Sequence, residues 1–424
     1  GGFGSKMPVY PGYVTAIVAS IVLGRPVKWI ESRIENLTTT GFARDYHMTG
    51  ELAADKDGRI KALRVGVLAD HGAFDSCADP SKFPAGLFHI CTGSYDIPNA
   101  YARVDAVFTN AVPVDAYRGA DRPEATFILE RIVDQAAAET GVDPAELRRR
   151  NLIKPEQFPY QTPVALQYDT GNYEATLDQA LKAADYAGFE ARRKQSAAAG
   201  KLRGVGLSCY IEACGIAPSN VVGSLGARAG LYEAATIRVN PTGSVVVLTG
   251  SHTHGQGHET TFAQVVSDML GIDYDAVEIV HGDTAKVPFG MGTYGSRSIA
   301  VGGAAIAKAV DKIIAKGKKI AAHLLEAGEG DIVFENGAFK VAGTDREKSF
   351  GDIALTAYVP HQYPLESLEP GLEETAFYDP ANFTYPAGTY VCEVEVDPDT
   401  GRVTVASFHA SDDFGNLINP MIVE

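Results

Sequence analysis

Hydrophobic and polar residues alternate with a period of two in three stretches of the chain, and a polar turn interrupts each stretch. Alternation of this kind is typical of half-buried strands, and Asp, Asn, Pro and Gly supply the backbone angles of a tight reversal. Each stretch therefore predicts a β-hairpin, although their irregular spacing does not fit a solenoid. The three stretches are His47 to Leu68 around Asp55–Gly58, Ala235 to Leu248 around Asn240–Gly243, and Tyr390 to Phe408 around Asp397–Gly401.

Helical periodicity fills the intervals between these hairpins. Apolar residues recur at helical spacing in Thr126 to Thr140, in Thr261 to Leu270 and in Ala304 to Leu325. The first two end directly before a glycine, which is a common helix stop. The longest apolar run, Val14 to Leu23, is far shorter than the roughly 20 residues of a membrane span and predicts a buried helix. Helices and hairpins together predict a mixed α+β fold.

A chain of 424 residues is too long for one ordinary core of about 150 residues. The polar, helix-forming stretch Asp185 to Lys201 is the best boundary candidate. We therefore expect a first domain at residues 1–200 and a second at residues 201–424, with loops from both domains lining one crevice.

Composition excludes several classes of function. The net charge of −16 and the scattered Lys and Arg residues make nucleic acid an improbable partner. The chain begins at Gly1, with no basic segment before the first apolar run, so no signal peptide is visible. Five cysteines without disulfide or zinc spacing predict structural thiols in a reducing compartment, which favours a cytoplasmic location.

Four segments contain more glycine and polar residues than turns require. Glycine lets the backbone approach a ligand closely, and Arg and Lys add charge-assisted hydrogen bonds, so together the segments could hold a large anionic cofactor. Singly, each has a simpler explanation: a turn at GGFG, a helix start after Gln256, or a surface arginine pair at Arg118 and Arg122. The segments are Gly1–Lys6, Ala116–Arg122, His254–His258 and Gly292–Ser298.

The order of the motifs is more informative than any one of them. GGFGSK, AYRGADRPEA, GQGHET, GTYGSRS and DDFGNLINPMIVE follow one another along the chain. In this order they resemble the molybdopterin-binding segments of molybdenum hydroxylase large subunits, the family of xanthine dehydrogenase, aldehyde oxidase and carbon monoxide dehydrogenase. The resemblance covers essentially the whole chain and is closest to the carbon monoxide dehydrogenase-like branch, with a glycine-type active-site loop.

The resemblance implies a role for each loop. Two molybdopterin-binding domains, built from hairpins and helices, would hold the cofactor at their interface, and the pterin dithiolene rather than protein side chains would hold the molybdenum. Arg118 would orient substrate or stabilise developing charge, and Phe3 would wall the substrate pocket. The cofactor-binding residues implied are Gly2, Phe3, Gly4, Ala116, Tyr117, Arg118, Gly119, Gly255, Gln256, Gly257, His258, Thr293, Tyr294, Gly295, Ser296, Arg297 and Ser298.

The same resemblance implies an activity and a set of partners. The chain would bind molybdopterin cytosine dinucleotide and belong to an oxidoreductase that hydroxylates an aldehyde or an N-heterocycle with water-derived oxygen. Electrons would pass to [2Fe-2S] centres and FAD on partner chains, because no iron–sulfur cysteine spacing occurs in this chain. The expected assembly is a dimer of heterotrimers that includes the remaining large-subunit segments, in the cytoplasm or at the inner face of the membrane.

Three departures from the family pattern leave alternatives open. Carbon monoxide oxidation in this family uses a copper held by a loop cysteine, whereas Gly119 follows Arg118 here, so that alternative is disfavoured. The family's general-base Glu lies in a loop beyond the last motif, so the chain alone should be inactive and could be a cofactor-binding scaffold. Asp121 stands where related loops often have a glycine, and its carboxylate could alter the polarity of the substrate site or pair with Arg122, of which the ion pair is the preferred interpretation. A β-rich adhesive or carbohydrate-active protein rests only on the hairpins.

Overall fold

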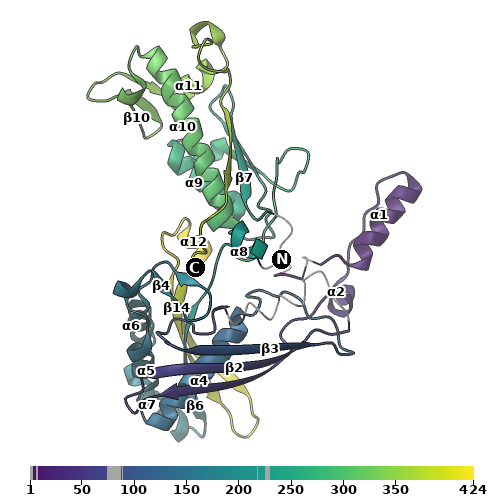
Figure 1. The fold of residues 1–424 in the computed structure, drawn as a ribbon, viewed down its shortest axis with the longest axis vertical. Helices are drawn as coiled ribbons and strands as arrows, with labels where there is room; N and C mark the ends of the chain where they lie inside the picture. The colour runs from purple at the N-terminus through teal and green to yellow at the C-terminus, as the bar shows by residue number, and fades with distance from the viewer. Residues whose placement is uncertain (1–2, 6–7, 74–86, 88, 217, 225–229) are drawn as a thin grey trace. The chain divides into compact units, whose positions relative to one another are not determined.

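The chain folds as two compact units in a computed structural model that describes residues 3–5, 8–73, 87, 89–216, 218–224 and 230–424 (Figure 1). Unit 1 comprises residues 214–384 and 416–424, and unit 2 comprises residues 3–213 and 385–415. The chain therefore crosses from one unit to the other three times. How the expected domains at 1–200 and 201–424 divide the binding of a cofactor stays a prediction.

Unit 2 contains most of the helices of the first half of the chain and three small sheets. Its helices are α1 (Pro11–Leu23), α2 (Arg33–Thr39), α4 (Arg122–Thr140), α5 (Pro144–Asn151), α6 (Tyr173–Ala183) and α7 (Phe189–Ala198), with 3-10 turns η1 (Pro155–Gln157) and η2 (Tyr186–Gly188). Its strands are β1 (Tyr46–Ala54), β2 (Ile60–Asp70), β3 (Ala100–Val107), β4 (Tyr160–Gln161), β5 (Gln167–Tyr168), β6 (Leu202–Ile211), β14 (Ala387–Val396) and β15 (Val403–Asp413).

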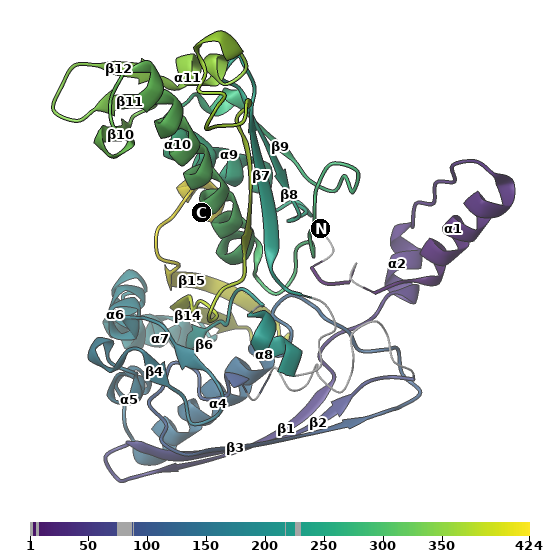
Figure 2. The ribbon, with the colours of Figure 1, turned by 45° about the horizontal axis from the view of Figure 1, so that its top comes forward.

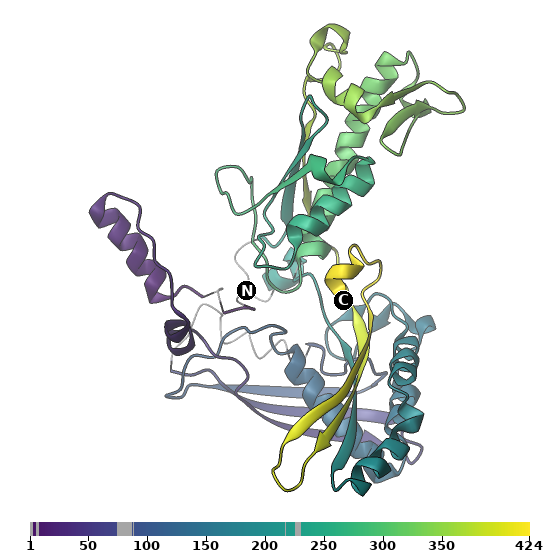
Figure 3. The same cartoon turned by 180° about the vertical axis from the view of Figure 1, so that it is seen from behind.

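Two of the predicted hairpins lie in this unit. β1 and β2 pair antiparallel around the turn at residues 55–58, and β3 adds to β2 in parallel. β14 and β15 form the long yellow hairpin visible in Figure 3, and β6 completes its sheet. Helix α4 packs on β1 and β6, so it joins the two sheets into one unit. The stretch expected to be a boundary forms α7, where Arg192 is paired with the buried Glu393 of β14.

Helix α1 is present as predicted, but the expectation that it is buried is wrong for this chain. None of its residues is buried, and Ile21 and Val22 are about three-quarters exposed. At its start Tyr13 contacts Tyr10 and Trp29 edge-on, and near its end the Ser20 hydroxyl donates to the Arg25 carbonyl. An apolar sequence favours burial only where another surface covers it.

Unit 1 has a four-stranded sheet in the order β13-β7-β8-β9 and a second, three-stranded sheet. Its helices are α8 (Ser219–Ser224), α9 (His258–Leu270), α10 (Ala304–Leu324), α11 (Phe350–Thr356) and α12 (Pro420–Val423), with the π-helical turn η4 (Ser298–Gly303) and the 3-10 turns η3 (Tyr274–Ala276), η5 (Glu329–Asp331) and η6 (Pro360–Gln362). Its strands are β7 (Glu233–Val239), β8 (Val245–Thr249), β9 (Val277–Val280), β10 (Ile332–Glu335), β11 (Ala338–Val341), β12 (Glu347–Ser349) and β13 (Glu373–Tyr378).

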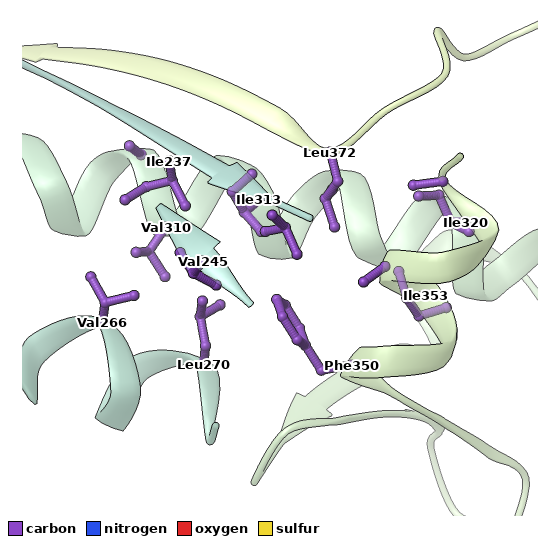
Figure 4. Packing of buried hydrophobic residues seen from close by; sticks show 14 of the residues in the cluster. Ile237, Val245, Val266, Leu270, Val310, Ile313, Ile320, Phe350, Ile353 and Leu372 are labelled. Atoms are coloured by element: carbon purple, nitrogen blue, oxygen red, sulfur yellow. The ribbon is translucent and has the colours of Figure 1, made fainter. Parts of the chain in front are cut away.

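The core of unit 1 confirms the helix and hairpin patterns of the sequence. β7 and β8 form the predicted antiparallel hairpin, and α9 and α10 lie beside it (Figure 2). Ile306, Val310, Ile313 and Ile320 of α10 are fully buried along one stripe. Figure 4 shows Val310 near Val245 of β8, and Ile320 near Ile353 of α11. Burial of each such side chain stabilises the fold by about 1.5–3 kcal/mol.

No helix in the described part of the chain is both long enough and apolar enough to cross a lipid bilayer.

Candidate functional site

The first two glycine-rich segments meet in unit 2. Gly4 adopts a left-handed φ of 117°, and a Cβ atom there would lie 2.3 Å from the carbonyl oxygen of Ala116. The ring of Phe3 lies 6.2 Å from that of Tyr117, and both side chains are about half exposed. Only glycine allows this approach of backbone to backbone, so Gly4 joins two loops that are far apart in sequence. Gly2 lies outside the described residues.

The segment between α2 and β1 holds both loops in place. The hydroxyl of Tyr10 donates to the carbonyl of Ser5 at 2.6 Å and accepts from the amide of Gly41 at 3.2 Å. The amide of Phe42 donates to the Pro113 carbonyl at 2.9 Å, next to the second loop. Gly41 is therefore linked to the first loop through Tyr10, and Phe42 is hydrogen-bonded to the strand-like segment that precedes the second loop, a role that no sequence motif indicated.

Arg44 contacts the second loop and the helix that follows it. Its guanidinium donates to the carbonyl of Arg118, lies 5.0 Å over the ring of Tyr117, and forms an ion pair of 3.1 Å with Glu124. The backbone of Arg44 is left-handed, with φ 66°. No sequence motif indicated Arg44, because its partners lie more than 70 positions away along the chain.

The backbone of Arg118 is held by a neighbouring residue, whereas its side chain is not. The carbonyl is held by Arg44, whereas the side chain is exposed and makes no hydrogen bond or ion pair to another described residue. A cationic group of this kind on a fixed backbone is available to a ligand. The geometry is compatible with the proposed roles of Ala116, Tyr117, Arg118 and Gly119, which stay predictions.

Asp121 does not pair with Arg122 as expected. The Asp121 carboxylate is buried and accepts a 2.8 Å hydrogen bond from the Tyr46 hydroxyl, while Arg122 donates to the carbonyls of Ala120 and Ala213. Burial, with a further contribution from nearby Glu124, raises the pKa of Asp121 to about 7. Asp121 also precedes α4 in a left-handed conformation. It therefore fixes the end of the loop and does not take part in a surface ion pair.

The loop at residues 254–258 lies in unit 1 and leads into α9. Gly255, with φ 110°, has open space where a Cβ atom would be, and Gly257 precedes the helix with φ 81°. Gln256 is exposed, and its side-chain oxygen accepts the amide of His254 at 2.5 Å. The amides of the first turn of α9 have no partners within the helix, as at any helix start, so the loop could receive an anionic group.

Histidines gather around this loop. The rings of His254 and His281 lie 5.5 Å and 5.0 Å from that of His252, and His281 is 3.0 Å from a carboxylate oxygen of Glu259. His258 is buried against Phe262, and this burial lowers the pKa of His258. No set of side chains suited to holding a metal ion occurs among the residues that the structure describes.

The last candidate loop contains an arginine with a structural role. Arg297 is fully buried, and its guanidinium donates to the Glu233 carboxylate at 2.9 Å and to the Leu231 carbonyl at 2.7 Å. Cofactor binding through the Arg297 side chain is therefore disfavoured. Roles for the rest of the segment, Thr293, Tyr294, Gly295, Ser296 and Ser298, stay predictions, and the Thr293 and Ser298 hydroxyls lie 3.0 Å apart.

Models of molybdopterin cofactor-binding domains match residues 1–152 and residues 179–424. The carbon monoxide dehydrogenase large chain of Hydrogenophaga pseudoflava is 53% identical over all of this chain and 53% of its own length. The nicotine 6-hydroxylase large subunit of Paenarthrobacter nicotinovorans is 34% identical, over all of this chain and 52% of its own length. The chain thus spans about half the length of these relatives.

Solved structures of similar enzymes superpose over the whole of this chain. A Cu,Mo-CO dehydrogenase superposes with a TM-score of 0.94 at 48% identity, covering all of this chain and 54% of the solved one. Quinoline 2-oxidoreductase from Pseudomonas putida 86 also superposes with a TM-score of 0.94, at 34% identity and the same coverage.

Proposed function

We propose a function on the premise that this chain belongs to the family of molybdopterin cofactor-binding proteins, in the carbon monoxide dehydrogenase-like branch of molybdenum hydroxylase large subunits. The chain forms the cofactor-binding part of an oxidoreductase that hydroxylates an aldehyde or an N-heterocycle with water-derived oxygen. The observation that supports this best is the exposed Arg118 side chain on a backbone fixed by Arg44, in the loop whose Tyr117 ring lies 6.2 Å from that of Phe3.

The residues present fit such a cofactor. In unit 1, Gly255 and Gly292 have left-handed backbones with open space where a Cβ atom would be, which leaves room for a group to approach the main chain. The start of α9 adds amides and a positive dipole end, which favour phosphate. We infer that these loops hold the cytosine dinucleotide form of molybdopterin.

In unit 2, the chemistry available to the protein is orientation and charge stabilisation. When bound, the molybdenum cofactor supplies the two-electron oxidation of a substrate carbon. Phe3 and Tyr117 present half-exposed aromatic faces on which a planar or carbonyl substrate can lie. Arg118 then donates hydrogen bonds to the substrate oxygen or ring nitrogen, where negative charge develops.

Two observations bear on the class of substrate. The relatives named carbon monoxide dehydrogenase share 53% and 48% identity with this chain, which favours carbon monoxide as a second candidate substrate. However, residues 116–122 contain no thiol, and soft thiolate ligands are what copper(I) prefers. We therefore place the aldehyde or N-heterocycle first. Copper analysis of the purified protein separates the two, since a copper-dependent site requires the metal to be present.

Partner chains complete this proposal. Relatives that match over this whole chain are named as large chains or subunits, which implies smaller partners. We propose that an iron–sulfur subunit and an FAD subunit accept the electrons in the cytoplasm, in a dimer of heterotrimers. The chain alone would then be inactive, because the general-base Glu and the electron acceptors lie elsewhere.

Cofactor analysis of the full-length large subunit from its native host tests the proposal. The protein is denatured, its molybdenum is measured, and the extracted pterin is hydrolysed and identified by mass. We expect near-stoichiometric molybdenum and release of a cytidine nucleotide. A preparation that contains only flavin or nicotinamide nucleotide would contradict the proposal.

A further inference from the structure

We propose that Arg44, anchored by Glu124, is a positioning residue that fixes the backbone of the loop at residues 116–119 and thereby aims the Arg118 side chain. The inference rests on the proposed function, because it assigns Arg44 a part in the reaction that Arg118 assists. Arg44 itself is not assigned any contact with the reacting atoms. It acts only through the loop that it holds.

Three contacts of the Arg44 guanidinium define the arrangement. One nitrogen donates to the carbonyl of Arg118, the Nε atom lies 3.1 Å from the Glu124 carboxylate, and the plane lies over the ring of Tyr117. The planar fork of arginine allows these contacts to be made at once, whereas a lysine ammonium is a single point of charge. Arg44 therefore fixes both the main chain of Arg118 and the ring of the residue before it.

Glu124 makes this contact rigid. It lies in the first turn of α4, its side chain is only 8% exposed, and burial raises its pKa. Its second carboxylate oxygen is buried and has no hydrogen-bond partner among the residues that the structure describes, so Arg44 is the charge that compensates the carboxylate. Through Glu124, Arg44 links the loop to a 19-residue helix.

The loop needs such a clamp because its own backbone is strained. Gly119, Ala120 and Asp121 are three consecutive residues with left-handed φ angles of 99°, 37° and 73°. Arg44 is itself left-handed, which is unfavourable for a residue with a side chain. Strain of this kind persists only where surrounding contacts hold the backbone. Here the strained backbone directly follows the exposed Arg118. The Tyr46 hydroxyl holds the other end of the loop at Asp121.

The test uses the complete enzyme assembly with the substitutions Arg44→Met, Arg44→Lys and Glu124→Gln. Molybdenum content, kcat, KM and hydrogen exchange of the peptide covering residues 114–122 are measured for each. Arg64→Met is the matched control, because Arg64 also forms an arginine–carboxylate pair in unit 2, with Glu51, but both partners are exposed.

Loss of the clamp should move the loop without removing the cofactor. For Arg44→Met we expect exchange of the loop amides to rise about tenfold, as for a locally opened segment. We expect kcat to fall roughly 10- to 100-fold, the scale of a misplaced catalytic group, with unchanged molybdenum. Arg44→Lys and Glu124→Gln should show smaller losses of the same kind, and Arg64→Met should match the wild type.

Some results would contradict the proposed role of Arg44. Unchanged loop exchange and unchanged kcat in Arg44→Met would overturn the inference, as would a loss that appears equally in Arg64→Met. If Arg44→Met does not fold, the same reading applies to Glu124→Gln, which keeps the arginine and the volume of the glutamate. Absence of molybdenum and pterin from the wild-type assembly would instead contradict the proposed function, so the two failures are distinguishable.

Discussion

Two arginines in glycine-containing loops, Arg118 in unit 2 and Arg297 in unit 1, look alike in the sequence and have opposite surroundings. Arg297 is fully buried and its donors face protein carbonyls and a carboxylate. Arg118 offers its carbonyl to Arg44 and leaves its side chain exposed. A glycine-rich context therefore does not decide whether an arginine serves the fold or a ligand.

The role of each arginine depends on whether a buried carboxylate nearby needs it as a partner. Glu233 of β7 is completely buried, and burial raises its pKa. A buried carboxylate requires a charged or hydrogen-bonded partner, and Arg297 is that partner. In unit 2, the carboxylate of Glu124 is instead paired with Arg44. The side chain of Arg118 is therefore available to bind a ligand.

The largest effect is expected from Arg297→Met. Removal of one member of a buried ion pair leaves Glu233 uncompensated and should lower the free energy of unfolding of unit 1 by about 3–5 kcal/mol. Urea unfolding followed by far-ultraviolet circular dichroism measures this change in the free energy of unfolding. The double variant with Glu233→Gln should recover part of the loss. A stable single variant would show that Arg297 is not structural.

Arg118→Met should instead leave the fold intact and impair the reaction. We expect kcat of the complete assembly to fall by roughly 10²–10³, the scale of a lost transition-state donor, with molybdenum content unchanged. The unfolding midpoint should stay within about 0.5 kcal/mol of the wild type, as for other surface substitutions. If only KM rises, Arg118 is a substrate anchor; if metal is lost, it is a cofactor ligand.

Asp121 should make stability depend on pH. Its folded pKa of about 7 lies above the value of about 3.9 for an unfolded aspartate, so the folded state holds an extra proton between those values. Stability contributed by that proton is therefore lost as pH rises toward 7. Asp121→Asn should reduce the fall in melting temperature between pH 5 and pH 7.5 by about 2–4 °C, on the order of 1 kcal/mol.

The control for this pH dependence is Asp105→Asn, since Asp105 is an exposed partner of Arg103. Its melting curves should follow the wild type at both pH values. The groups that face Asp121 are Tyr46, Glu124, Arg122 and Arg44, and none of them is changed. An equal response of both variants would rule out Asp121 as the titrating group.

The smallest effect is expected at Gln256 in unit 1. Gln256→Ala removes the turn hydrogen bond to the His254 amide and should weaken cofactor retention by about 0.5–1 kcal/mol. Molybdenum remaining after dialysis against a range of urea concentrations measures retention. Identical curves for the variant and the wild type would make Gln256 only a residue of the helix entry.

Local patterns predicted the local structure correctly. The three hairpins and helices α4, α9 and α10 follow from periodicity and from glycines that stop helices, because these signals need no distant partner. The segments at Gly4 and Ala116 could be chosen from their glycine and charge content. That they touch could be inferred only from the family resemblance.

Contacts across long sequence separations were not predictable in the same way. Arg44 lies outside every motif, and its role depends on meeting Arg118 and Glu124 in space. Burial of α1 was predicted from its apolar residues, yet none of the residues of that helix is buried. Asp121 was expected to pair with its chain neighbour, but Tyr46, from the start of β1, reaches it instead.

The most direct test of this account is the position of molybdenum in a crystal of the full-length large subunit, located by anomalous diffraction at the molybdenum edge. We predict one strong peak beside the loops at residues 3–4 and 116–119, with the Arg118 side chain directed toward the space next to it. A peak remote from these loops, or none in protein of proven activity, would contradict the assignment of the reaction to this site.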